Sequence, residues 1–597
     1  MPNERLSSTD LQDSNCTVTY THDTDNDDAK ASPPPKSRNS WRWQVEKGIL
    51  LFFHHMRKHV GVGLICAVAY FDPGNWGVDL EAGSQYGYRL LFVILLAGLF
   101  AIFLQVLASR LGCVTGLDLA SHTRLLLHDH STHPLLVRWA VLYPLYALAE
   151  IAIIATDLAE LLGSAVALCL LFPSLELWHG VLITTGDVIL LLCLGDPLRG
   201  KPLRWFELLI GGLVFAVMIC LCTIISRVEL DWADVFLGYL PSKYVFPNGA
   251  GYVSVGIIGA TIMPHSLFLG SALATQDRVS PSSPEPDDTP RPLQLERSFS
   301  VASSLLETKR HLKNFFARTF NSAILVPEKG TTPMEILKDT AKNHSQWINN
   351  SQEFVKKHIY HGTVDIVVSL LGFAVVINSL ILILASAVFF YGGVDVDNAG
   401  LFDAYDLIRD LVGKGAATIF ALALLCAGQS SSIIATVAGQ AVAEGFLRWR
   451  VSPFIRRLLT RLIAVIPSMA VAIALGRPGI DALLIASQVV LSIVLPFVSF
   501  PLIYLTSKRS VMSVRVAGAV IGPSVIRDNR QVESTFSTTT KDNDLTLGQD
   551  AESQANAPDA DKIVDYSNNW FATILAFSIW LVIVIANVYV LVTLGDS

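Results

Sequence analysis

Residues 60–78 read VGVGLICAVAYFDPGNWGV, an apolar stretch long enough to cross a membrane that nevertheless contains Asp72-Pro73-Gly74-Asn75. A carboxylate inside the hydrocarbon core costs about 2.5–3.5 kcal/mol on insertion scales. The Pro-Gly pair also removes backbone hydrogen bonds where no water replaces them. Both features are explained if the helix is broken at this point and the break lines an ion site.

The composition is typical of a protein with many membrane-spanning helices. Of the 597 residues, 52% are hydrophobic and 16% are charged, whereas soluble domains carry about 25% charged residues. The mean hydropathy is +0.47. A spanning helix needs about 20 mostly apolar residues. The eleven candidate spans, of which the fourth is short, are residues 60–78, 90–111, 135–171, 180–194, 206–225, 251–274, 364–391, 416–446, 458–475, 482–505 and 570–594.

Polar stretches divide these spans into groups. The expected parts are a disordered tail (1–45), helices 1–5 of a first repeat with helix 6 (46–275), a polar loop (276–362), helices 7–10 (363–506), a second polar loop (507–568), and helix 11 with a short C-terminus (569–597). Lys and Arg gather before helix 1 and in alternate connections, which predicts a cytoplasmic N-terminus and cytoplasmic polar loops. These loops offer room for cytoplasmic regulators. We expect the protein in the plasma membrane or in an endosomal or vacuolar membrane.

A second apolar stretch is interrupted in the same way. Residues 251–274 read GYVSVGIIGATIMPHSLFLGSALA, with Pro264 at the centre between Met263 and His265. Helices 1 and 6 are five spans apart and therefore run in opposite directions. Paired broken helices of this kind predict inverted repeats with a substrate site where the breaks meet. The expected fold is an all-α polytopic membrane protein with a LeuT-like 5+5 inverted repeat, broken helices 1 and 6, and an eleventh helix.

The residues at the two breaks carry the donor atoms of a metal site. Asp72 supplies a carboxylate and Asn75 an amide oxygen, and the breaks would free carbonyls such as those of Ala69 and Ala260. Met263 adds a thioether. Oxygen-only sites favour Mg²⁺ and Ca²⁺, whereas sulfur shifts the preference toward Mn²⁺, Fe²⁺, Co²⁺ and Cd²⁺. A methionine often only fills a gap in a core, but its place beside Pro-His in a broken helix favours a ligand.

Three carboxylates in the third apolar stretch indicate a path for protons. Glu150, Asp157 and Glu160 are separated by seven and three residues, which places them near one stripe of a helix. Ionisable groups in such a position are typical of proton relays. Arg457 and Arg461 are the expected partners of Asp157 or Glu160. The alternative is a purely structural ion-pair network, and Arg457 also fits the positive-inside rule.

Taken together, DPGN in helix 1 and MPH in helix 6 resemble the paired signatures of the Nramp (natural resistance-associated macrophage protein) family of proton-coupled divalent metal transporters. The stretches LAEIAIIATDLAELLGSA, CAGQSSSIIATVAGQAVAEGF and SQVVLSIVLPF resemble that family as well. The resemblance implies that Gln488 joins the metal ligands in some conformations. It also implies that Asp72 accepts a proton, with His265 nearby, and that the carboxylates and arginines form the exit path.

Two positions depart from the family pattern. Many members have a glutamine where this chain has Val494, and a second helix-6 histidine where this chain has Gly270. Both resemble the fungal branch, which is associated with manganese. The prediction is therefore a non-enzyme: a proton-coupled symporter that imports Mn²⁺, and also Fe²⁺, Co²⁺ or Cd²⁺, by alternating access. Its expected partners are metal ions, protons and the lipid bilayer, with no cofactor and no nucleic acid.

Three other functions are alternatives to a metal symporter. A metal-sensing or signalling protein could retain a transporter-like core, and the long loops leave room for that role. An intramembrane aspartyl protease needs two facing aspartates, which one relay helix does not supply. An amino-acid symporter on the same fold would have to bind a carboxylate that Asp72 repels.

Overall fold

The computed structural model describes residues 61–187, 204–241, 250–277, 340–392, 399–448, 453–515 and 563–595. The expected tail, most of both polar loops and part of the fourth apolar stretch lie outside these ranges. Within them, eight helices are long and apolar enough to cross a membrane, with α3 and α4 counted as one and two shorter apolar helices besides. The chain is thus a multi-pass membrane protein.

The first break divides helix 1 at Asp72. The half-helix α2 (Val62–Val68) continues as the 3-10 turn η1 (Ala69–Phe71), Asp72 is extended, and α3 (Pro73–Tyr86) begins at the next residue. Asp72 is the N-cap of α3, and its side chain accepts a hydrogen bond from the Asn75 amide. Aspartate at the N-cap and proline at the first helical position are both favoured there, so the sequence DPGN starts a new helix.

The second break divides helix 6 at Met263. The half-helix α12 (Ala250–Thr261) ends before it, and α13 (Pro264–Leu273) begins with proline at its first position. Met263 is extended and makes no side-chain cap. The predicted breaks in helices 1 and 6 are therefore confirmed.

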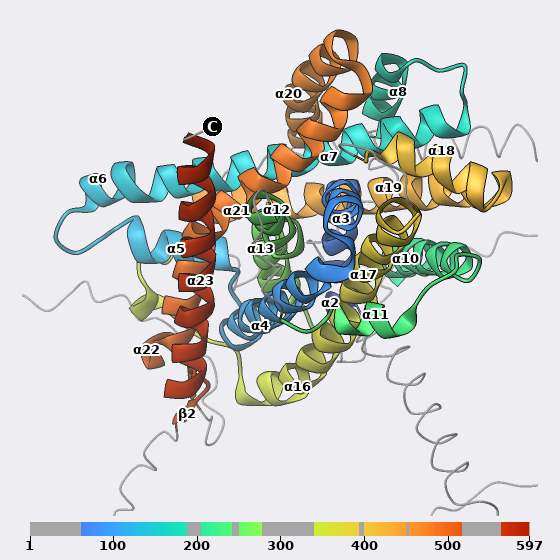
Figure 1. Ribbon diagram of the computed structural model, residues 1–597. Coiled ribbons are helices and arrows are strands. Elements are labelled where there is room, and N and C mark those ends of the chain that lie inside the picture. The colour runs from blue at the N-terminus through green and yellow to red at the C-terminus, as the bar shows by residue number, and fades with distance from the viewer. Residues whose placement is uncertain are drawn as a thin grey trace, which may run out of the picture. The chain divides into compact units, whose positions relative to one another are not determined.

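The other long helices surround these two. In the first half they are α4 (Leu91–Thr115, after the turn η2, Gly87–Leu90), α7 (Tyr143–Leu171) with its leading turns α6 (Pro134–Val137) and η3 (Arg138–Leu142), α8 (Leu177–Thr184, with the turn η4, Thr185–Asp187) and α10 (Arg204–Ile225). In the second half they are α16 (Gln352–Ser369), η7 (Leu370–Val375), α17 (Val376–Ala385), η8 (Ser386–Phe390), α19 (Lys414–Leu447), α20 (Pro453–Ala474), α21 (Gly476–Ser507) and α23 (Trp570–Gly595). Half-helix α3 packs against α17, α12 and α21, and α7 packs along α19 (Figure 1).

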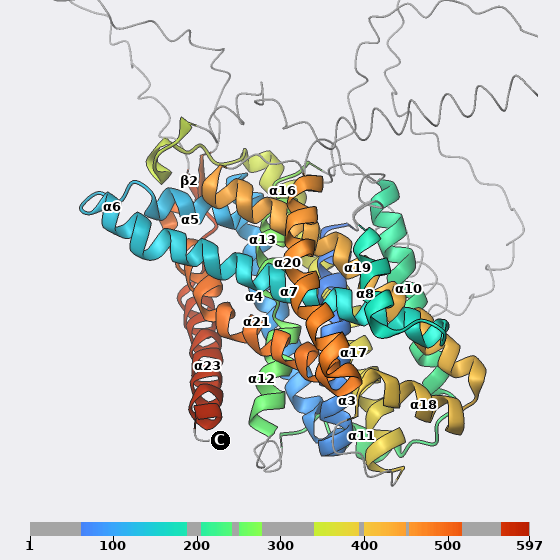
Figure 2. The ribbon, with the colours of Figure 1, turned by 90° about the horizontal axis from the view of Figure 1, so that it is seen from above.

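Short elements gather at the two ends of this bundle. At one end lie α5 (Leu119–Leu127), η6 (His344–Gln346) and α22 (Arg509–Met512), and at the other lie α11 (Trp232–Leu237) and α18 (Leu401–Leu411) (Figure 2). Strand β1 (Ser513–Arg515) pairs antiparallel with β2 (Ile563–Asp565), so that Val514 faces Val564. The sequence did not predict this ladder, which joins the two described ends of the second polar loop.

Candidate functional site

The head of α3 holds buried polar atoms without partners. Asp72 and Asn75 are 0% and 1% exposed. The Asn75 amide donates to Asp72 Oδ1 at 2.8 Å, but Asp72 Oδ2 and both side-chain atoms of Asn75 make no hydrogen bond within the described residues. Leaving such groups unsatisfied costs about 1–3 kcal/mol each. We therefore expect these atoms to bind a ligand.

Gln488 of α21 lies directly against this break. Its side chain is fully buried, and its Oε1 atom also has no hydrogen-bond partner among the described residues. A Cβ atom added to Gly74 would overlap the Gln488 amide. The glycine of DPGN therefore lets a side chain from α21 approach the backbone between Asp72 and Asn75.

The second break reaches the same residue of α21. A Cβ at Gly259, one residue before Ala260, would overlap the main-chain carbonyl of Gln488. Met263 and Ala260 are buried, and α12 also contacts η1, which carries Ala69. The structure thus brings α3 and α12 together at Gln488, and Met263 lies buried where the second helix breaks.

Pro73 fixes the position of the first break. A Cβ at Gly163 of α7 or at Gly428 of α19 would meet the proline ring. Both helices therefore approach the ring closely, and at Gly163 a side chain would overlap it. Because the ring is held on both sides, the Asp72 N-cap is held in place relative to α7.

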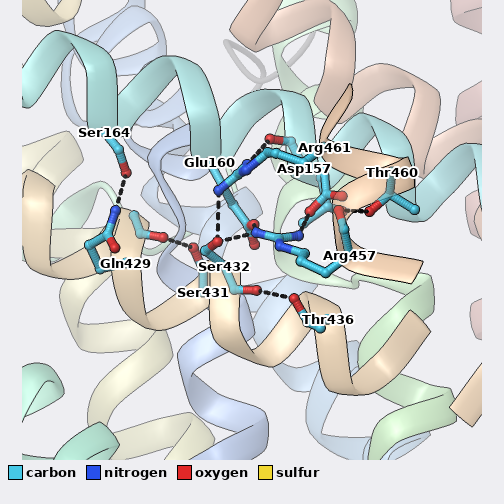
Figure 3. A network of polar contacts seen from close by, with 12 residues as sticks. Asp157, Glu160, Ser164, Gln429, Ser431, Ser432, Thr436, Arg457, Thr460 and Arg461 are labelled. Atoms are coloured by element: carbon cyan, nitrogen blue, oxygen red, sulfur yellow. Dashed lines mark hydrogen bonds and ion pairs between the residues drawn. The ribbon is translucent and has the colours of Figure 1, made fainter. Parts of the chain in front are cut away.

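A cluster of charged side chains lies beside the centre (Figure 3). Arg457 of α20 pairs with Asp157 of α7 and lies 3.6 Å from Glu160 Oε2. Arg461 donates to the main-chain oxygen of Asp157 at 3.0 Å and to Ser432 of α19 at 2.9 Å. Two carboxylates and two guanidinium groups balance in charge, which limits the cost of burying them. Asp157, Glu160, Arg457 and Arg461 thus come together, and Arg461 is held on the Asp157 backbone and on α19.

Glu150 lies apart from that cluster. Its partner is Arg456, whose Nη2 atom lies 2.7 Å from Glu150 Oε1, and sequence reasoning did not single Arg456 out. Its position directly before Arg457 in the sequence could have identified it. The side chains of Arg456 and Glu150 are 9% and 18% exposed. This pair therefore lies at the outer edge of the polar path.

His265 connects the breaks to the charged cluster. Its Nδ1 atom lies 3.3 Å from Thr156 Oγ1 of α7. Thr156 directly precedes Asp157, and His265 follows Met263 by two residues. A polar contact therefore links the second break to the helix that carries the carboxylates.

The two departures from the family pattern have different surroundings. Val494 is buried in the apolar core. A Cβ at Gly270 would overlap the amide of Gln105 from α4, which accepts from Tyr70 Oη at 3.1 Å and donates to the Ser266 carbonyl at 3.3 Å. Gln105 thus fills the place of the second histidine, and sequence reasoning missed it together with Tyr70 and Ser266.

A cavity opens toward the end of the bundle that carries α18. Its volume is about 390 Å³, and Gly77 of α3 and Ile485 of α21 line it, each one helical turn from Gly74 and Gln488. Its acidic lining residues are Glu81, Asp403 and Asp481. Deeper along α3, Asp79 is buried and its Oδ2 has no hydrogen-bond partner among the described residues. Sequence reasoning missed Asp79, although an ionisable residue seven positions after Asp72 was a visible signal.

Within the described residues, no group of three or more His, Cys, Asp or Glu side chains could hold a metal ion. A metal centre at the breaks would therefore depend on the amide, thioether and carbonyl donors of Asn75, Met263, Ala69 and Ala260 beside the single carboxylate of Asp72. Such a mixed, weakly charged donor set suits a transported cation better than a permanently bound one.

Two broken helices that meet around buried, unpartnered donors define a membrane transporter of small cations. A model of the family described as natural resistance-associated macrophage protein-like matches residues 63–306 and 331–521, and the chain belongs to this Nramp family of divalent metal transporters. The chain is 37% identical to the manganese transporter pdt1 of Schizosaccharomyces pombe over 541 residues, which cover 90% of this chain and 85% of that protein.

Other relatives are also named as metal transporters. Identity to the iron transporter SMF3 of Saccharomyces cerevisiae is 35%, over 90% of this chain and 96% of that one. Identity to the divalent metal cation transporter MntH of a Nostoc species is 37%, over 80% and 90% of the two chains. The crystal structure of the Eremococcus coleocola manganese transporter superposes with a TM-score of 0.60 at 25% identity, covering 93% of this chain and 87% of that one. The predicted fold class is confirmed, and the protein is a transporter and not an enzyme.

Proposed function

We propose that this protein is a proton-coupled symporter that brings Mn²⁺, and more weakly Fe²⁺, Co²⁺ or Cd²⁺, into the cytosol by alternating access. The metal ligands are Asp72, Asn75, Met263 and the carbonyls of Ala69 and Ala260, with Gln488 joining them. The observation that carries the proposal is the meeting of both breaks at Gln488, where buried acceptor atoms of Asp72, Asn75 and Gln488 have no hydrogen-bond partner in the described part of the chain.

The donor set favours a transition metal over Ca²⁺ or Mg²⁺. One carboxylate and several neutral oxygens give little net charge, and the Met263 sulfur is a poor ligand for hard cations. The manganese and iron named for the relatives pdt1 and SMF3 support the same choice.

The route for protons begins at Asp72 and continues through His265 to the charged cluster on α7. The contact between His265 and Thr156 supports this step, because Thr156 adjoins Asp157. Glu160, Arg457 and Arg461 continue the path, and Glu150 with Arg456 ends it. Beyond Asp72, which both share, separate routes would let the metal and the proton leave the site by different paths.

The cavity on the α18 side supports entry from that end, which the Lys and Arg distribution predicts to be outside. Its carboxylates attract cations, and its floor lies one helical turn from the breaks. A membrane potential of 100 mV contributes about 2.3 kcal/mol per charge, so import of a divalent ion gains roughly twice that amount.

Proteoliposomes holding the full-length protein test this function. We expect uptake of radioactive Mn²⁺ that rises as the external pH is lowered, together with acidification of the lumen that depends on Mn²⁺. Asp410→Asn, which removes an exposed carboxylate of α18 outside the cavity lining, is the control for a lost carboxylate, and Asp72→Asn is expected to abolish both signals. Mn²⁺ binding without any uptake would favour the metal-sensing alternative, and uptake without proton influx would reject the coupling.

A further inference from the structure

A second cavity lies at the opposite end of the bundle, which the sequence predicts to be cytoplasmic. Its volume is about 700 Å³. Its walls come from α5 and the turn that follows it, from the start of α6, from residues 340–342 and from the end of α19. Residues distant in the sequence thus converge on one open hollow far from the metal centre.

The lining of this cavity is predominantly basic. Arg124, Lys342 and Arg448 contribute three permanent positive charges, and Asp129 is the one acidic residue among the lining residues. Asp129 already pairs with Arg138 at 3.1 Å. Among the lining residues, positively charged side chains therefore outnumber negatively charged ones.

Two of these cations are held by main-chain contacts. Arg124 donates through Nε to the Gly445 carbonyl at 3.0 Å, and Arg448 donates through Nη2 to the Ala341 carbonyl at 2.8 Å. Lys342 is exposed at the rim. Because the guanidinium groups are positioned in advance, an anion would lose little free energy in ordering them. Guanidinium groups also match the geometry of phosphate.

The helix next to this cavity has an apolar surface. Pro134 lines the cavity and begins α6, where Leu135 and Leu136 are 67% and 65% exposed, and Trp139 in the following turn is 69% exposed. Figure 2 shows α6 projecting sideways from the bundle at the end where β2 lies. Apolar and tryptophan side chains next to basic ones are typical of segments that lie in the membrane interface.

We propose that this cavity binds the phosphomonoester headgroup of an anionic lipid from the cytoplasmic leaflet, of the phosphoinositide type. Arg124, Lys342 and Arg448 would contact the phosphate while α6 lies among the acyl chains. The exposed apolar side chains favour a lipid over a soluble phosphate, because only a lipid places both chemistries side by side. A bound headgroup would join α5, residues 340–342 and the end of α19.

The test uses the purified full-length protein in detergent and a fluorescent dioctanoyl phosphatidylinositol 4-phosphate as the probe. We expect saturable binding that dioctanoyl phosphatidylcholine does not compete for. Lys342→Ala should weaken it about fivefold, which corresponds to about 1 kcal/mol for one cationic side chain. Lys356→Ala, an exposed lysine on α16 outside the cavity, is the matched control and should leave binding unchanged.

Four results would overturn the proposal. Equal competition by inositol 1,4-bisphosphate or inorganic phosphate would identify a soluble anion and not a lipid. Equal competition by phosphatidylcholine would show that the phosphomonoester is not recognised. An equal loss in Lys342→Ala and Lys356→Ala would mean diffuse attraction to a basic surface, and no saturable binding would remove the site. Because the readout is lipid binding, none of these results bears on metal transport.

Discussion

Gln488 is the residue at which the candidate centre is assembled. Its amide lies against Gly74 of the first break, and its carbonyl lies against Gly259 beside the second break. A larger residue at Gly259 would meet main-chain atoms of α21 and push α12 away, whereas one at Gly74 would displace the Gln488 side chain. The geometry of the proposed metal site therefore depends on two glycines that supply no ligand atom themselves.

Replacing the thioether should change which cations are accepted. We expect Met263→Ala to retain part of the Mn²⁺ uptake but to admit Ca²⁺, because the remaining donors are all oxygen. A shift of about tenfold in the ratio of the two affinities would correspond to about 1.4 kcal/mol. Competition of Ca²⁺ against radioactive Mn²⁺ in proteoliposomes measures it. Unchanged exclusion of Ca²⁺ would show that the sulfur is not the selectivity element.

Introducing the second histidine should destabilise the protein unless Gln105 is replaced by a smaller residue at the same time. Gly270→His would overlap the Gln105 amide, and overpacking of a core costs about 1–3 kcal/mol. We expect a lower thermal unfolding midpoint in detergent, recovered in part by adding Gln105→Ala. Gly212→His is the control, since nothing lies within 4 Å of its added Cβ. Equal loss in both single variants would argue against a specific clash.

At the scale of whole elements, the sequence predicted the helix breaks well, because the signals are local. Proline at the first helical position and aspartate at the N-cap act within four residues. Pairings between elements were not predictable in the same way. The contact of Glu150 with Arg456, and that of Gln105 with Gly270, depend on how each helix is rotated about its axis. The β1–β2 ladder was missed because its partners lie far apart in the sequence, as in the pair Val514 and Val564, which are 50 residues apart.

Helices α7, α19 and α20 form one polar unit, and its role in transport can be separated from its role in stability. We expect Asp157→Asn to reduce Mn²⁺-dependent proton influx more than Mn²⁺ binding, since the variant removes a proton carrier outside the metal ligands. Breaking a buried pair also costs about 3–5 kcal/mol, so the unfolding midpoint must be measured alongside. Asp410→Asn, which removes an exposed carboxylate of α18 outside this unit, is the control. A destabilised variant with an unchanged ratio of protons to metal would support a purely structural network.

Residues 340–351 form an anchoring segment that fastens the end of the first polar loop to the bundle. Trp347 Nε1 donates to the Thr115 carbonyl at 2.8 Å, and Asn349 Nδ2 donates to the Val511 carbonyl at 2.7 Å. His344 Nε2 lies 3.0 Å from His122 Nδ1, so one imidazole must donate and the other accept. Burial lowers the pKa of His344 from 6.5 to about 4.

This lowered pKa makes the anchoring segment sensitive to acid. The docked form favours neutral His344, so docking is most stable above pH 6.5. It weakens as the pH falls toward 4, because the undocked form binds more protons in that window. Near pH 5.5 we expect about tenfold more hydrogen exchange over residues 340–351 than at neutral pH, after correction for intrinsic rates. His344→Gln should remove this dependence, and a pH response that persists in it would point to another group.

For the whole molecule, we propose one cation site shared by two inverted halves, with a cavity on its α18 side that is lined by three carboxyl groups and by Arg477. In this proposed site the first half supplies only oxygen donors, from Asp72, Asn75 and Ala69, and Met263 of the second half supplies the sulfur. A bound ion that has both oxygen ligands and the Met263 sulfur would therefore show that both halves bind it.

X-ray absorption at the cadmium edge on the purified, Cd²⁺-loaded protein tests this most directly. The account predicts a first shell of oxygen ligands with one sulfur, and loss of that sulfur in Met263→Ala with retention of the oxygen shell. Asp72→Asn should abolish stoichiometric binding. A shell without sulfur in the unaltered protein, or an identical spectrum in Met263→Ala, would contradict a centre built from both broken helices.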